Sequence, residues 1–121
     1  MTNEEFQVEL RREIKIAKRQ FFNSNQYPRV YRQWNLYKVQ LKALQVLIDN
    51  FPKVRLKDFE QLIRQNPTTL KFLNDCLNVL PNMLSELKQN DYQYIFDKFY
   101  LVKRKEMDRI KGEKRLNLLG K

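Results

Sequence analysis

The residues whose types and spacing favour a chemical role are lysines and arginines, and they gather in two segments of the chain. One segment spans residues 11–19 and the other spans residues 98–115. The candidate nucleic-acid-binding residues are Arg11, Arg12, Lys15, Lys18 and Arg19 in the first, and Lys103, Arg104, Lys105, Arg109, Lys111, Lys114 and Arg115 in the second. Cations at this density can contact successive phosphates of a nucleic acid.

Each segment also has an explanation that involves no ligand. Arg11, Lys15 and Lys18 share one side of a helix, where Glu9 and Glu13 can neutralise part of an ordinary solvated face. Cations in the last turn of a helix are stabilised by the helix dipole. That effect accounts for two or three cations of the second segment but not for all seven, so a functional role stays open for both segments.

The formal net charge of +10 is unevenly placed along the chain. Residues 1–49 contribute +4, from nine basic and five acidic residues, and residues 50–97 contribute zero, from six of each. Residues 98–121 contribute +6, from nine basic and three acidic residues. Such a field attracts polyanions and speeds their encounter with the protein, although it does not name one.

A catalytic or metal site finds little support in the residue types. Histidine, the commonest general base and metal ligand, is absent. Both glycines, Gly112 and Gly120, lie in the last ten residues, so the rest of the chain cannot form a glycine-rich phosphate loop. Cys76 lies on the apolar side of its helix, where an inert buried thiol is expected. We therefore expect no enzyme activity, no metal and no cofactor.

Length and composition bound the class of protein. A chain of 121 residues with 42% hydrophobic residues is expected to form one domain with a modest core. No run of about 18 apolar residues is present, and the acidic N-terminus lacks the pattern of a signal peptide. Because such a run is missing, we expect no membrane partner. Because a single cysteine cannot form an internal disulfide, we expect a cytoplasmic protein.

The elements that must position these cations are helices, arranged around residues 30–51. Apolar residues there alternate at spacings of three and four, as they do along one side of a helix. The members of this stripe are Trp34, Tyr37, Leu41, Leu44, Ile48 and Phe51. Further apolar residues widen the stripe, so we expect this helix to lie at the centre of a bundle and to be contacted from several sides.

The two terminal helices carry the basic segments. The first is expected to start beside Thr2, which has the spacing of a capping residue. The last is expected to start after Asn90 or Asp91, with inward apolar positions continuing as far as Met107 and Ile110.

Two shorter regions between the long helices also have helical spacing. Apolar residues recur at helical intervals over 56–65 and 68–79, and again in a short segment near Met83. The pair 56–65 and 68–79 has the outline of a helix-turn-helix, but its second helix is mostly apolar and offers few side chains that could contact base edges. We therefore interpret the pair as a structural helical hairpin.

These elements predict an all-α fold, a compact bundle of five or six helices with two long basic terminal helices around a central apolar helix. Gly112 is expected to end the last helix, since glycine commonly follows the C-terminus of a helix. A single helical domain then spans residues 1–111, and residues 112–121 form a basic C-terminal tail.

Aromatic residues interleave with arginines at the start of the central helix. Tyr27, Tyr31, Trp34 and Tyr37 lie there beside Arg32. Aromatic and cationic side chains in this arrangement can stack on exposed bases. Such rings more often belong to a core and keep only a polar tip at the surface, and we favour that interpretation here.

Two stretches of the chain resemble parts of small helical regulators from phages of low-GC Gram-positive bacteria. The opening helix of those regulators resembles IKIAKRQFFNSNQYPR, and the helix before their sigma-like C-terminal reader resembles LPNMLSELKQNDYQYIFDKFY. The resemblance covers about a third of the chain and stops after FDKFY, where a basic run replaces a second turn and recognition helix. It implies a regulatory role in transcription or replication. The abundance of Asn, Lys, Gln, Tyr and Phe is consistent with an AT-rich genome, and hence with a phage, plasmid or Gram-positive origin.

Two functions are consistent with these features. The first is a regulatory nucleic-acid-binding protein, with DNA favoured over RNA, whose two basic segments meet on one face and make about six to eight phosphate contacts. The second is a protein–protein interaction module, such as a regulator, inhibitor or assembly factor, that docks on an acidic partner surface or forms a homodimer. One continuous basic face would favour the first function, and two separated patches would favour the second.

Overall fold

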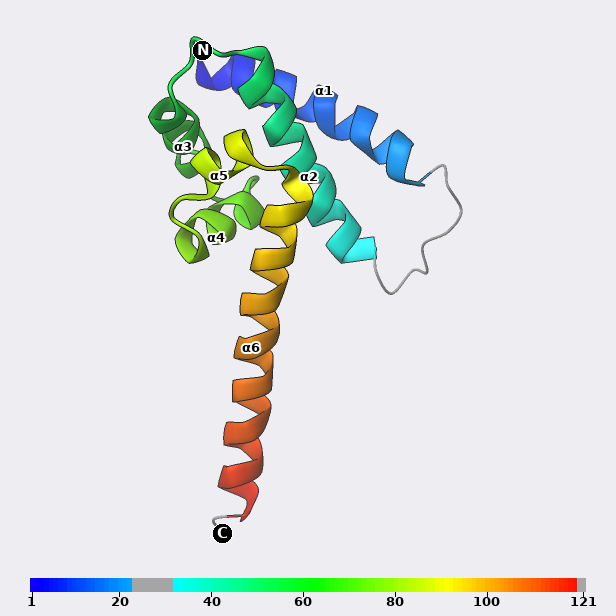
Figure 1. Ribbon diagram of the computed structural model, residues 1–121, viewed down its shortest axis with the longest axis vertical. Coiled ribbons are helices and arrows are strands. Elements are labelled where there is room, and N and C mark those ends of the chain that lie inside the picture. The colour runs from blue at the N-terminus through cyan, green and yellow to red at the C-terminus, as the bar shows by residue number, and fades with distance from the viewer. Residues whose placement is uncertain (23–31, 120–121) are drawn as a thin grey trace.

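Helices make up the fold. The computed structural model describes residues 1–22 and 32–119. Every regular element within those ranges is a helix: α1 (Asn3–Phe22), α2 (Arg32–Asn50), α3 (Leu56–Arg64), α4 (Lys71–Val79), α5 (Met83–Gln89) and α6 (Tyr92–Leu119) (Figure 1). The predicted all-α bundle is confirmed. Tyr27, Tyr31 and the start of the expected helix at residue 30 lie outside the described residues.

The central helix of the bundle is α2, as the width of its apolar stripe predicts. It packs against α1, α4, α5 and α6. Leu41, Leu44 and Leu47 have no exposed surface. Figure 1 shows α1 along one side of α2 and the short helices α3, α4 and α5 gathered on the other. A helix that is apolar over much of its circumference can be contacted in this way from several directions.

Side-chain caps mark where the first and last helices start. The backbone N–H of Glu5 donates to Thr2 Oγ1 at 3.1 Å, and the backbone N–H of Tyr94 donates to Asp91 Oδ1 at 3.0 Å. Each bond satisfies one of the backbone donors that the first turn of a helix leaves without a partner. The expected starts of both helices are confirmed.

The side chain of Gln45 joins the middle of α2 to the start of α6. Its Nε2 donates to the carbonyl oxygens of Leu87 at 3.1 Å and Asn90 at 2.8 Å. Its Oε1 accepts a hydrogen bond from the backbone N–H of Tyr92 at 3.1 Å. The side-chain amide of Gln45 thus bonds backbone carbonyl groups at the end of α5 and a backbone N–H group at the start of α6. These bonds fix the point at which α6 begins relative to α2.

The expected end of α6 at Gly112 is wrong, because the helix continues to Leu119. Gly112 does not adopt a positive φ, and nothing lies within 4 Å of the place where a Cβ would be. One glycine inside a helix costs about 1 kcal/mol relative to alanine, which neighbouring helix-forming residues such as lysine, arginine and leucine can offset. Residues 112–119 are therefore part of α6.

The C-terminal part of α6 extends away from the other helices (Figure 1), and we call residues 101–119 the α6 arm. Before the arm, Ile95, Phe96 and Phe99 are buried. Met107 and Ile110 continue the same stripe and were expected to face inward, but they are 53% and 45% exposed. The apolar stripe of α6 continues past the buried core because α6 is longer than the bundle against which it packs.

Candidate nucleic-acid interface

The solvent side of α1 carries the first group of predicted cations. The opposite side of the helix buries Phe6, Leu10 and Ala17. The exposed cations, which we call the α1 patch, are Arg11, Arg12, Lys15, Lys18 and Arg19. Arg12 forms ion pairs with Glu9 at 3.1 Å and Glu13 at 4.0 Å. The other four cations have no ion pair with any residue that the structure describes, so they are available to an anion.

The α6 arm carries the second group. Lys103 pairs with Glu106 at 3.5 Å and Arg109 pairs with Glu113 at 3.9 Å. The exposed cations without an ion pair to a described residue are Arg104, Lys105 and Lys111. The backbone at Lys114 and Arg115 is helical, and their side chains lie outside the described set. The arm therefore combines unpaired cations with two exposed ion pairs.

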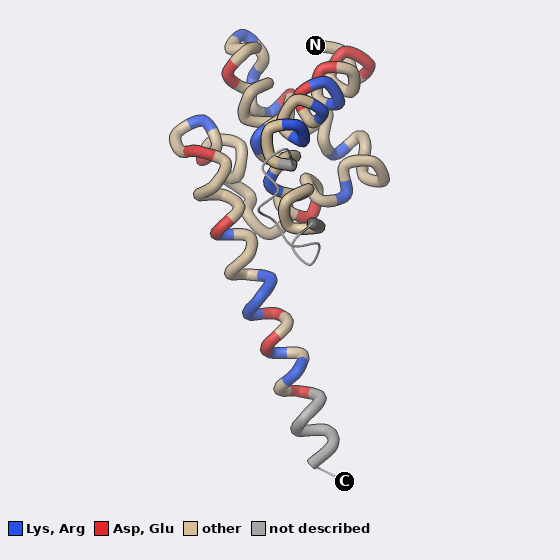
Figure 2. The backbone as a smooth tube through the Cα atoms, turned by 90° about the vertical axis from the view of Figure 1, so that its right-hand side faces the viewer, with Lys and Arg blue, Asp and Glu red and all other residues tan. Residues whose placement is uncertain are grey.

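The expectation that residues 11–19 and 98–115 come together on one face is wrong. Figure 1 shows the α6 arm pointing away from α1, and Figure 2 shows its Lys and Arg residues spaced along the extension, apart from those of α1. The two helices approach each other at the body end of α6, where the rings of Phe21 and Tyr92 are 6.3 Å apart. Because α6 is longer than the bundle, the cations of the α6 arm lie at a distance from the α1 patch.

The α3–α4 hairpin uses polar side chains for its own structure. The second helix begins at Lys71 rather than at residue 68, since the preceding residues form a turn. Asn74 Nδ2 donates to the carbonyl oxygen of Ile63 at 2.9 Å, and Arg64 Nη1 donates to Asn78 Oδ1 at 3.1 Å. The buried side of α4 consists of Phe72, Leu73, Cys76 and Leu77. These bonds fit the interpretation of a structural hairpin.

Cys76 is fully buried on α4. Burial, and secondarily the charge of Asp75, raise the pKa of its thiol from 9.0 to about 12. A thiol in this state is a poor nucleophile at neutral pH. Within residues 1–22 and 32–119, no group of three His, Cys, Asp or Glu side chains could hold a metal ion. No helix in those ranges is long and apolar enough to cross a bilayer.

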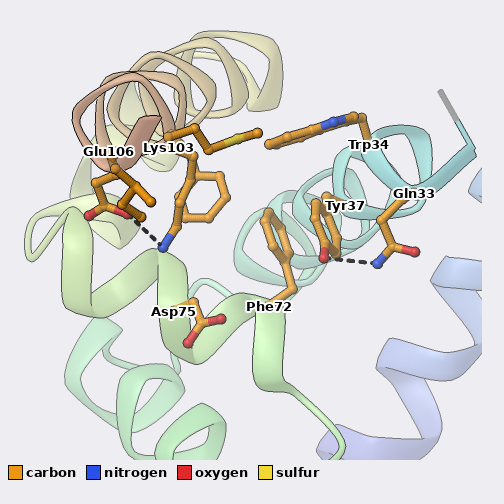
Figure 3. Close-up of a pocket in the computed structure, with 10 residues that line it drawn as sticks. Gln33, Trp34, Tyr37, Phe72, Asp75, Lys103 and Glu106 are labelled. Carbon is orange, nitrogen blue, oxygen red and sulfur yellow. Dashed lines mark hydrogen bonds and ion pairs between the residues drawn. The ribbon is translucent and has the colours of Figure 1, made fainter. Parts of the chain in front are cut away.

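A cavity of about 300 Å³ lies where α2, α4 and α6 meet (Figure 3). Its aromatic walls come from Trp34 and Tyr37 of α2, Phe72 of α4 and Phe99 of α6. The other lining residues of this aromatic cavity, as we call it, are Gln33, Asp75, Lys103, Glu106, Met107 and Ile110. The sequence singles out Trp34 and Tyr37, but only the packing of three helices brings the other two rings to them, so sequence reasoning missed the cavity.

The described part of the chain thus presents the α1 patch and the α6 arm as separate basic surfaces, and an aromatic cavity adjoins the arm. The function has to be inferred from these features, because their residues are the only guide to a ligand. Comparison of the chain with protein-family models, with curated proteins and with solved structures found no match.

Proposed function

We propose that this chain is a small regulatory nucleic-acid-binding protein whose main contact is the α6 arm, with DNA as the first ligand to test. The observation that carries the proposal is that Arg104, Lys105 and Lys111 are exposed on the arm without an ion pair among the described residues. Cations on a helix that no other element covers can approach phosphates without losing internal contacts. The net charge of +10 strengthens the attraction to any polyanion.

Helical geometry spreads the arm cations over two sides. Lys105 and Arg109 are four residues apart and share one side, and Arg104 and Lys111 are seven residues apart and share another. The apolar stripe that continues through Met107 runs beside Arg104 and Lys111, whereas Lys105 and Arg109 lie on the opposite side of the helix. The arm can therefore offer phosphate contacts on two sides of the helix, one of which adjoins the apolar stripe.

The α1 patch is a second basic surface that the arm does not join. A single run of phosphates that follows the arm is therefore not expected to reach Arg11, Lys15 and Lys18 at the same time. We expect about four phosphate contacts from the arm in place of the six to eight that one shared face would supply. The α1 patch then contributes mainly by speeding the encounter with the polyanion.

A protein–protein interaction module is the second candidate, and the separation of the two basic patches favours it. Leu101, Met107 and Ile110 are 57%, 53% and 45% exposed on the arm, and apolar side chains of this size add binding energy at protein interfaces. In this case an acidic protein surface takes the place of the phosphates. Replacement of Leu101, Met107 and Ile110 by alanine should then abolish partner binding and leave the bundle folded.

Fluorescence anisotropy tests the first function against the second. Labelled duplex DNA, single-stranded DNA and RNA are each titrated with the protein at two salt concentrations. We expect binding that weakens steeply with salt, with a slope of about −4 in log K against log salt for four duplex phosphate contacts. Absence of binding to all three nucleic acids at low salt rejects the proposal.

Matched variants locate the contact on the arm. The triple change Arg104→Ala, Lys105→Ala and Lys111→Ala should weaken binding and reduce the salt slope by about three. The control changes Lys53, Lys57 and Lys71 to alanine, which are exposed cations of the body, so it lowers the net charge equally. Equal losses of affinity in both variants would show that net charge, rather than the arm, drives binding.

A further inference from the structure

The walls of the aromatic cavity are held in place by contacts among their own rings. Tyr37 and Phe72 are stacked, with centroids 4.1 Å apart and planes 1° apart. Trp34 meets the edge of Tyr37 at 5.7 Å, and Phe72 meets Phe99 at 5.1 Å, both nearly perpendicular. Because these rings already restrain one another, a ligand that entered the cavity would lose little affinity to ordering its walls.

Polar groups border the apolar walls at a few positions. Figure 3 shows Gln33 on α2, Asp75 on α4 and the ion pair between Lys103 and Glu106 on α6. Gln33 Nε2 donates to the hydroxyl oxygen of Tyr37 at 2.8 Å. Apolar walls with a small number of placed polar groups are the usual composition of a small-ligand site, and about 300 Å³ is the lower end of the usual size range.

The charge of the lining selects what can enter. The lining contains two carboxylates, Asp75 and Glu106, and one ammonium, Lys103, so its formal charge is −1. A phosphate would meet this negative charge, whereas the amino group of a base could donate a hydrogen bond to either carboxylate, as the N4 amino group of cytosine does to Asp or Glu. The same lining therefore favours the amino group of a base over a phosphate.

Cations on the adjoining arm are next to cavity-lining residues along α6. Met107 and Ile110 belong both to the cavity lining and to the α6 arm. Arg104 and Lys111, three residues before Met107 and one residue after Ile110, are exposed and unpaired within the described residues. A strand that places a base in the cavity can thus keep its backbone against the arm.

We propose that the aromatic cavity binds an unpaired, amino-bearing nucleobase of a single-stranded nucleic acid, while cations of the α6 arm contact the adjacent phosphates. This inference rests on the proposed function, and it specifies the substrate class as single strands. Stacking on aromatic side chains requires a base with a free face, which a base pair within a duplex does not offer. The same chemistry is available from single-stranded DNA and from RNA.

Trp34 makes the occupancy of the cavity measurable, because it is the one tryptophan of the chain. Its fluorescence is followed while the protein is titrated with short oligo(dC), oligo(rC), an abasic strand of equal length and a duplex. We expect quenching by both cytosine strands and about tenfold weaker binding of the abasic strand, which has the phosphates but no bases. The duplex should bind without quenching Trp34.

Paired variants separate the cavity from the arm surface. Met107→Ala and Asp75→Asn alter the cavity lining, and we expect each to weaken oligo(dC) binding while leaving abasic-strand binding unchanged. Leu101→Ala and Asp108→Asn are the controls, since both residues are exposed on the arm outside that lining. Circular dichroism confirms that each variant is folded. Equal behaviour of the cavity and control variants would overturn the proposal.

The remaining outcomes distinguish this inference from the proposed function. Equal affinities for oligo(dC) and the abasic strand would overturn the base site and leave phosphate binding by the arm intact. No binding of any strand would overturn both. Sedimentation showing a concentration-dependent dimer that Ile110→Glu dissociates, with no quenching by cytosine strands, would assign the cavity to a second copy of the chain and overturn the base site.

Discussion

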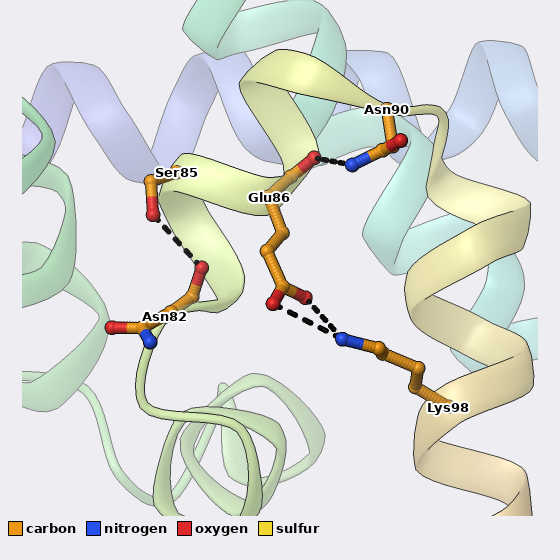
Figure 4. Close-up of polar contacts among 5 residues, drawn as sticks. All are labelled: Asn82, Ser85, Glu86, Asn90 and Lys98. Atoms are coloured by element: carbon orange, nitrogen blue, oxygen red, sulfur yellow. Dashed lines mark hydrogen bonds and ion pairs between the residues drawn. The ribbon is translucent and has the colours of Figure 1, made fainter.

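Lys98 Nζ on α6 lies 3.1 Å from both carboxylate oxygens of Glu86 on α5, at the base of the α6 arm (Figure 4). The two residues come from neighbouring helices, so this ion pair fixes α6 against the body before the arm begins. The hydrogen bond to Glu86 raises the pKa of Lys98 above its ordinary value of 10.5.

The first prediction concerns this ion pair and pH. Because the pKa of Lys98 is raised in the folded state, the pair stabilises the fold below pH 10.5 and loses that contribution as pH rises through the folded pKa. Lys98→Met should therefore lower Tm at neutral pH. The difference in Tm between this variant and the native protein should become smaller in strong alkali and at high salt. Lys57→Met, at an exposed body cation, is the control. A difference that is constant with pH would contradict the assignment.

The second prediction concerns the core stripe of α2. Leu44 has no exposed surface, so Leu44→Ala should lower the free energy of unfolding by about 2–5 kcal/mol, measured by urea denaturation. Val8 on α1 is 64% exposed, and Val8→Ala should change stability by less than about 0.5 kcal/mol. A loss below about 1 kcal/mol at Leu44 would place the stripe outside the core.

The third prediction concerns Gly112. Nothing lies within 4 Å of the place where its Cβ would be, so Gly112→Ala should fit without a clash and favour the helical arm by about 1 kcal/mol. Far-UV circular dichroism should show more helix and a less frayed arm on heating. Gly112→Pro should reduce the helical signal, because proline interrupts the backbone hydrogen bonds of a helix interior. An unchanged signal in both variants would show that residues 112–119 are not helical in solution.

The fourth prediction concerns Cys76, whose thiol pKa is raised to about 12. A thiol reagent should label the native protein slowly at neutral pH and rapidly once urea unfolds it. Between pH 9.0 and about 12 the unfolded thiol ionises while the folded thiol does not, so the free energy of unfolding should fall as pH rises. Cys76→Ala should remove this part of the pH dependence. Rapid labelling of the native protein would contradict the burial of the thiol.

Local chemistry made much of the fold predictable. The caps at Thr2 and Asp91 and the spacing of Leu41 and Leu44 depend on residues that are close in sequence, and each lies as predicted. The end of α6 did not follow from local rules, because a cost of about 1 kcal/mol at one glycine is smaller than the combined preference of its neighbours for helix.

The candidate site was less predictable than the fold. Periodicity shows which side of α6 is apolar, but it cannot show where the partner helices end, so Met107 and Ile110 were expected to be buried and are exposed. The separation of the α1 patch from the arm has the same origin. The aromatic cavity depends on Phe72 and Phe99 meeting Trp34, and no spacing within one helix contains that information.

Because α6 is one continuous helix from Tyr92 to Leu119, a small change of angle where it meets the bundle would produce a larger displacement at its C-terminal end. Its 19 residues from 101 to 119 span about 28 Å, so a rotation of roughly 10° at the base would sweep the tip through about 5 Å. The aromatic cavity lies at that base, between α6 and the helices α2 and α4. The aromatic cavity is therefore lined by the same helices whose packing determines the direction in which the distant end of the arm points.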